Sequence, residues 1–174
     1  RVRRCCNSGG SRIPLERVRR LEGDANLLIG DIVSRFDAWD YLLVFADIEA
    51  PRQLPFATLR ALKAQHRSVD LYVLFPLDMA LKRLMAYSPR RREQWAPTLD
   101  SFFGRTDWRD LADEFRANPG RKDELARRLT ALYCEQLRTL WDDAEPVVDV
   151  YLRRRQRLYR MLFAASHEAA VRIR

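Results

Sequence analysis

Two apolar runs constrain the fold more than any other feature of this 174-residue chain. One run is Tyr41–Ala46 and the other is Leu71–Phe75. Runs this short are typical of strands that are buried on both faces. A segment with helical spacing lies between them, and its apolar stripe includes Phe56, Leu59 and Leu62. The succession of strand, helix and strand predicts a βαβ unit with parallel strands.

The flanking segments extend this unit on both sides. Residues 17–21 have the pattern of a short strand, and Asp24 follows as the expected N-cap of a helix. Residues 77–141 have mostly helical periodicity. Residues 147–152 and 158–163 then have the pattern of two strands joined by a short basic turn. We therefore predict an α/β protein with a partial Rossmann-like sheet, a helical insertion at about 77–141 and a C-terminal antiparallel hairpin.

The positive charge is concentrated at the start of the chain. The net charge is +8, and residues 1–20 hold seven Arg and one Glu, so most of the excess lies there. We expect a disordered basic tail at 1–16 and a single domain at 17–174. No apolar run is long enough for a membrane span, and three cysteines form no disulfide framework, so we expect a cytoplasmic protein with reduced thiols.

The order of predicted elements resembles the second half of the class I methyltransferase fold. Gly23-Asp24-Ala25-Asn26 is similar to the motif after the third strand of that fold, and Phe45-Ala46-Asp47 to the end of the fourth strand. The resemblance implies that Asp24 and Ala25 contact the adenine of S-adenosylmethionine. No Gly-rich loop after an apolar strand precedes Gly23, so we expect the chain to lack the first two strands.

Several segments together resemble the three-Cys-motif partner (TcmP) family, whose members have a methyltransferase-like domain. They occur in the family's order: Gly23–Asn26, Leu43–Asp47, Val69–Ala80, Leu99–Gly104 with Trp108-Arg109, and Leu158–His167. The chain has Asp47-Ile48-Glu49-Ala50-Pro51 where the family has Asp-Pro-Phe-Gly or Asp-Pro-Pro-Gly. The resemblance implies a radical-S-adenosylmethionine-like partner protein, and an incomplete domain that binds no cofactor alone.

Three acidic residues follow the predicted central strands. Asp47 and Glu49 come after the first apolar run, and Asp78 comes after the second. Open α/β sheets bind ligands at the carboxyl ends of their strands, so we expect these residues to share a cleft. Asp47 and Glu49 are candidates for catalysis as a general base, with pairing to Arg52 as the alternative, and Asp78 is a candidate for substrate contact.

Other classes of function remain open on the sequence. Arg153, Arg154 and Arg155, together with Arg90–Arg92, predict a phosphate or nucleic-acid contact in a non-enzymatic binding module, or else a solvated basic surface. A partner subunit is the third alternative, and it predicts exposed apolar surface beside the sheet. His66 is expected on the surface, and the spacing of Cys and His residues predicts no metal site.

Overall fold

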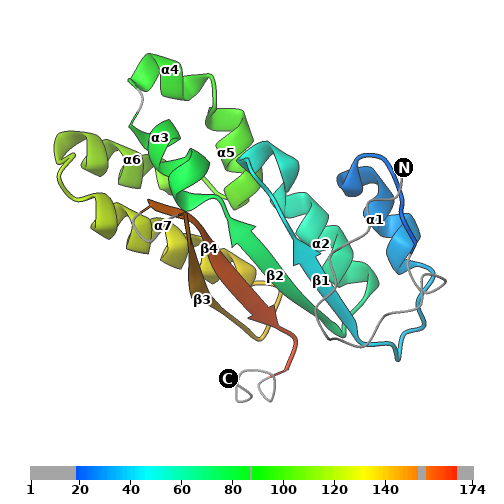
Figure 1. Ribbon diagram of the computed structural model, residues 1–174. Coiled ribbons are helices and arrows are strands. Elements are labelled where there is room, and N and C mark those ends of the chain that lie inside the picture. Colours follow the sequence, from blue (N-terminus) through cyan, green and yellow to red (C-terminus); the bar gives the residue numbers. More distant parts are fainter. Residues whose placement is uncertain (1–18, 87, 153–155, 168–174) are drawn as a thin grey trace.

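The computed structural model describes residues 19–86, 88–152 and 156–167. They form a mixed α/β structure around one four-stranded sheet (Figure 1). The strands are β1 (Leu42–Ala46), β2 (Val69–Phe75), β3 (Asp143–Leu152) and β4 (Gln156–Ala165), in the order β1-β2-β4-β3. β1 and β2 are parallel, whereas β4 runs antiparallel to both of its neighbours. The βαβ unit and the antiparallel hairpin are thus confirmed.

The helices make up the other regular elements of the described structure. They are α1 (Ala25–Val33), the 3₁₀ turn η2 (Pro51–Gln53), α2 (Phe56–Gln65), the π-helical turn η3 (Leu77–Leu81), α3 (Lys82–Met85), α4 (Pro89–Glu93), α5 (Ala96–Phe103), α6 (Trp108–Ala117) and α7 (Lys122–Leu137). The predicted helical insertion corresponds to the segment from η3 to α7, which lies between β2 and β3.

An aromatic cluster joins β2 to this helical insertion. Phe75 of β2 stacks on Tyr133 of α7 with ring centroids 5.1 Å apart, and Tyr133 stacks on Phe102 of α5 at 4.8 Å. Phe56 of α2 and Phe103 of α5 meet Tyr133 edge to face. All five rings are fully buried. Such contacts add to the hydrophobic gain of burial and hold the helices at a fixed place on the sheet.

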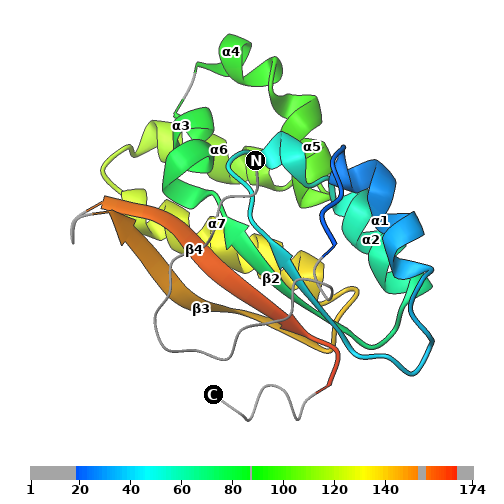
Figure 2. The same cartoon turned by 45° about the vertical axis from the view of Figure 1, so that its right-hand side comes forward.

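The two faces of the sheet differ. Helices α1, α2, α5 and α7 lie on one face, and no described helix covers the other (Figure 2). We predicted that the first apolar run is buried on both faces, and this was wrong, because Leu43 and Phe45 are exposed. β1 is an edge strand with helices on one side only, so its alternate side chains point away from the core.

Two further expectations need correction at the level of local structure. Residues 19–22 form no strand, while residues 17–18 and the predicted tail at 1–16 lie outside the described residues. His66 is 4 % exposed rather than on the surface. It follows the last turn of α2 and its Nε2–H donates to the carbonyl of Asp37 at 3.0 Å, which holds the ring beneath the loop before β1.

The turn after α5 requires a glycine. Gly104 has φ +67°, and a Cβ atom there would lie 2.8 Å from the ring of Phe56. We expect Gly104→Ala to lower the free energy of unfolding by about 2 kcal/mol, through left-handed strain and overpacking. Gly120→Ala is the matched control, since its added Cβ meets no atom within 4 Å. Urea denaturation of both variants measures the difference. Equal stabilities of the two variants would contradict the requirement for glycine at position 104.

The hydroxyl of Tyr133 is buried without a hydrogen-bond partner in the described structure. Burial also raises the pKa of this phenol, so it stays neutral. We expect Tyr133→Phe to raise the free energy of unfolding by about 1 kcal/mol, because it removes a desolvated donor. Thr130→Val is the contrasting variant and should destabilise, because the Thr130 hydroxyl donates to Ala126 O at 2.8 Å. Thermal unfolding distinguishes the two signs.

Candidate functional site

An open cleft lies beside the carboxyl half of β1, between that strand and the N-terminal part of α1. Its volume is about 750 Å³. Its apolar wall includes Val44 and Ala46 of β1, Ile29 of α1, and Leu59 and Leu62 of α2. The cleft is wide enough for a small organic ligand and lies at the sheet edge where open α/β folds bind them.

Asp24 stands at the rim of this cleft and caps α1. Its Oδ1 accepts hydrogen bonds from the Asn26 backbone N–H at 2.9 Å and from Asn26 Nδ2 at 2.8 Å. The predicted N-cap is therefore confirmed. Within the described structure Oδ2 of Asp24 accepts no hydrogen bond, so this oxygen can accept one from a ligand. Ala25 lines the cleft beside it.

Asn26 connects three segments and was missed by the sequence analysis. Besides its contacts to Asp24, its Nδ2 donates to Gln53 O at 3.2 Å, and its Oδ1 accepts from Thr58 Oγ1 at 2.8 Å. These bonds fix the start of α1 to η2 and α2. The partners lie 27 and 32 residues away in sequence, so no local pattern pointed to them.

The loop after β1 carries the two candidate catalytic carboxylates. Buried Ile48 anchors it, while Asp47 and Glu49 on either side are exposed. Gln53 Oε1 accepts from the backbone N–H of Glu49 at 2.6 Å and of Ala50 at 2.9 Å, which shapes the turn. Asp47 lines the cleft together with Asp24. The alternative, an ion pair with Arg52, is not formed among the described residues.

The charges of these carboxylates act on Tyr159 of β4. Burial raises the pKa of its phenol, and the negative charges of Glu49 and Asp47 raise it further. The phenol is therefore a protonated hydrogen-bond donor at neutral pH. Because β4 is three strands removed in chain order from the loop, only the sheet order brings Tyr159 to this place.

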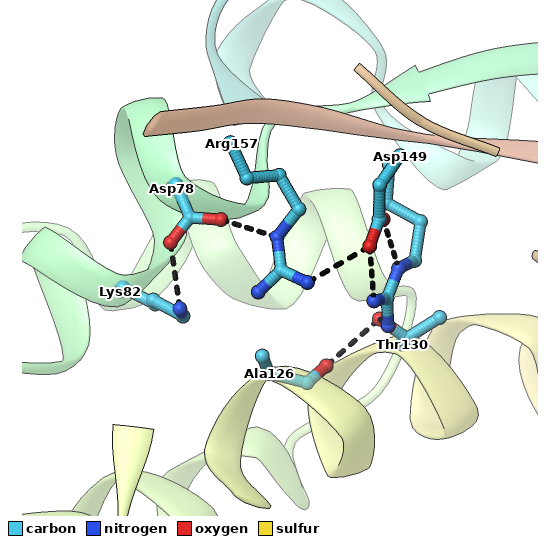
Figure 3. Close-up of polar contacts among 7 residues, drawn as sticks. Asp78, Lys82, Ala126, Thr130, Asp149 and Arg157 are labelled. Atoms are coloured by element: carbon cyan, nitrogen blue, oxygen red, sulfur yellow. Dashed lines mark hydrogen bonds and ion pairs between the residues drawn. The ribbon is translucent and has the colours of Figure 1, made fainter. Parts of the chain in front are cut away.

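Asp78 is held in an ion-pair network after β2 (Figure 3). Its Oδ1 accepts from Lys82 Nζ at 2.6 Å and its Oδ2 from Arg157 Nε at 2.7 Å. Arg157 Nη1 also donates to Asp149 Oδ2 at 3.0 Å. Both oxygens of Asp78 are thus engaged by cations, and the residue does not line the cleft beside β1. A substrate contact by Asp78 stays a prediction.

Asp149 is the second anion of this network. Arg160 Nε donates to its Oδ1 at 2.6 Å, and Arg160 Nη1 reaches Thr130 Oγ1 of α7 at 3.3 Å (Figure 3). The network therefore joins β3 and β4 to η3 and α7. Hydrogen bonds from Arg160 and Arg157 lower the pKa of Asp149 to about 2. The role of these contacts is to hold the β3–β4 hairpin in place, and this role needs no catalysis by Asp149.

A further polar cluster closes the amino ends of the strands. Asp70 is buried and accepts from the Ser166 N–H at 2.8 Å, while Lys63 Nζ donates to Ser166 Oγ at 2.6 Å. Burial lowers the pKa of Lys63. Burial and a hydrogen bond to Asp70 raise the pKa of Tyr41 to about 12. The Ser166 hydroxyl donates to the carbonyl of Val69, so its proton is engaged by the backbone and the hydroxyl is not poised as a nucleophile.

The two Arg clusters that predicted a phosphate contact differ in what the structure shows of them. Arg153, Arg154 and Arg155 lie outside the described residues. In the other basic cluster, Arg92 is buried and its Nη2 donates to Asp113 Oδ1 at 2.5 Å, so it holds α4 to α6. Across the described ranges, no three His, Cys, Asp or Glu side chains come together as a metal site.

A scan of protein-family models finds no match to the chain, and searches of curated proteins and of solved structures also find none. None of the helices at residues 19–167, outside the gaps given above, is long and apolar enough to cross a bilayer.

The lowered pKa of Asp149 predicts acid-sensitive stability. Its folded pKa of about 2 lies below the ordinary Asp value, so the network stabilises the fold above about pH 4 and is lost as the pH falls toward 2. We expect Asp149→Asn to lower the free energy of unfolding by roughly 1 to 2 kcal/mol at pH 7 and to flatten its decline between pH 4 and 2. Denaturant titrations across this range measure both effects.

Asp107 provides the control. The guanidinium of Arg105 lowers the pKa of Asp107, but that pair is local and partly exposed. Asp107→Asn should change stability by less than about 0.5 kcal/mol at pH 7. A larger loss for Asp107→Asn than for Asp149→Asn would contradict the importance of the hairpin network.

Proposed function

We propose that this chain is a TcmP-like protein derived from an S-adenosylmethionine-dependent methyltransferase fold, and that the cleft beside β1 is the nucleoside end of that site. The observation that carries the proposal is the meeting of Asp24 and Asp47 in one cleft at the carboxyl end of β1. The resemblance assigns these two residues to the motifs after the third and fourth strands. They are 23 positions apart and come from different elements.

The sheet order supports the same proposal. The second half of a class I methyltransferase sheet begins with two adjacent parallel strands. The last strand in sequence lies between the second of these and the strand that comes just before it in the chain, and it runs antiparallel to both. Here β4 is last in sequence and lies antiparallel between β2 and β3. Many α/β folds have parallel neighbours, so the position and direction of β4 are the more specific part of this argument.

The described residues fit only part of the cofactor. The free Oδ2 of Asp24 suits the exocyclic amine of adenine, and Ile29 and Val44 supply apolar surface for a ring. No described residue supplies a Gly-rich loop after a strand for the remainder of the molecule. S-adenosylmethionine would supply a methyl group for transfer. Asp47 would face the acceptor as a general base, with Glu49 in the same loop.

We therefore expect calorimetry to detect no micromolar binding of S-adenosylmethionine by this chain. Adenosine at millimolar concentration should still shift the amide resonances of Asp24, Ala25 and Asp47, because these residues line the cleft that we assign to the adenine. Micromolar affinity for the whole cofactor contradicts the incomplete site. Absence of any adenosine shift at Asp24 contradicts the nucleoside assignment.

Asp24→Asn isolates the ligand role of this residue from its capping role. Asparagine caps helices as well as aspartate does, but its Nδ2 replaces the free acceptor. We expect the adenosine Kd to rise about tenfold, the loss of one hydrogen bond to a charged group. Asp31→Asn, also on α1 and exposed, is the control and should leave the Kd unchanged.

A further inference from the structure

The backbone hydrogen-bonding groups on the outer edge of β1 pair with no described strand. The Leu42 N–H donates to Ser68 O at 2.9 Å, on the side of β2. Backbone direction alternates along a strand, so the N–H and C=O groups of Leu43 and Phe45 point away from β2. No strand within the described ranges pairs with that side. β1 also has no Lys, Pro or bulge, the features that usually protect an edge strand from a further strand.

The same residues expose apolar side chains. Leu43 is 65 % exposed and Phe45 is 58 % exposed, on the face of the sheet without described helices. Trp39, three residues before β1, is 95 % exposed. Backbone groups and apolar surface therefore coincide at one edge, which is more than the single exposed apolar residues common on protein surfaces.

Acidic residues flank this edge at both ends. Asp37 and Asp40 precede β1, and Asp47 and Glu49 follow it. None of the four forms an ion pair with another described residue, and Arg52 is the nearby cation at the cleft. If β1 paired with β1 of a second copy about a two-fold axis, the two strands would run antiparallel and be centred on each other. Asp40 of one copy would then lie near Asp47 of the other. The charges thus disfavour a second copy and favour a basic partner.

We propose that β1 accepts an extended segment of a partner polypeptide as an added strand. The backbone of that segment pairs with Leu43 and Phe45, and its alternate apolar side chains cover their side chains. Its Lys or Arg residues lie beyond the apolar part, facing Asp40 and Asp47. The proposal goes beyond the nucleoside cleft, because strand addition needs no cofactor and depends on the outward backbone groups of β1, although Phe45 and Asp47 also line the cleft.

A random nine-residue peptide library displayed on phage tests the proposal on the full chain. We expect enriched sequences to alternate apolar residues in the centre and to carry Lys or Arg at the ends. Synthetic copies of an enriched peptide should bind Phe45→Ser at least tenfold more weakly by fluorescence anisotropy. Asp40→Asn with Asp47→Asn should weaken binding severalfold at low salt and little at high salt.

Matched variants and peptides separate strand addition from other modes. Tyr151→Ser changes an aromatic residue that is 53 % exposed on β3, at the opposite edge, and should leave affinity unchanged. Methylation of alternate backbone nitrogens in the peptide should abolish binding, because it blocks ladder hydrogen bonds. Equal binding of the methylated peptide, or no enrichment over Phe45→Ser, overturns the proposal. A wild-type dimer that Phe45→Ser dissociates overturns it in favour of a second copy.

Discussion

The stacking of Phe75 on Tyr133 is the contact on which the remaining arrangement depends. It fixes the carboxyl half of β2 against α7, and Phe102 extends the same stack to α5. Because β1 and β4 pair with β2 on either side, the aromatic contact also sets where their ends lie. The cleft beside β1 and the ion network after β2 are both consequences of that placement.

The two parallel strands end in opposite electrostatic environments. After β2, Asp78 is neutralised by Lys82 and Arg157, and its network closes the end of the strand. After β1, Asp47 and Glu49 are exposed and have no ion-pair partner among the described residues. A closed ion network stabilises a fold, whereas exposed carboxylates at an open cleft remain free to meet a ligand. The asymmetry explains why we assign function to the end of β1 rather than to the end of β2.

The sequence predicted what depends on local pattern. Apolar runs identified β1 and β2, and Asp24 was recognised as a cap because capping involves a residue two positions away. The exposure of Leu43 could not be predicted, because an apolar run does not reveal whether helices lie on one face or on both. The contacts of Asn26 with Thr58, and of Arg157 with Asp78, join residues distant in sequence. Such pairs depend on the completed sheet order, which the sequence left open.

Hydrogen exchange along β1 in the unbound chain tests the central claim, an open edge beside an open cleft, most directly. The Val44 N–H points toward β2 and the Phe45 N–H away from it, although the two are neighbours in sequence. We predict that the Val44 amide exchanges about a hundredfold or more slowly than the Phe45 amide, which should exchange at nearly the rate of an unfolded peptide. Equal protection at the two positions would show that the edge is already paired and would contradict the account.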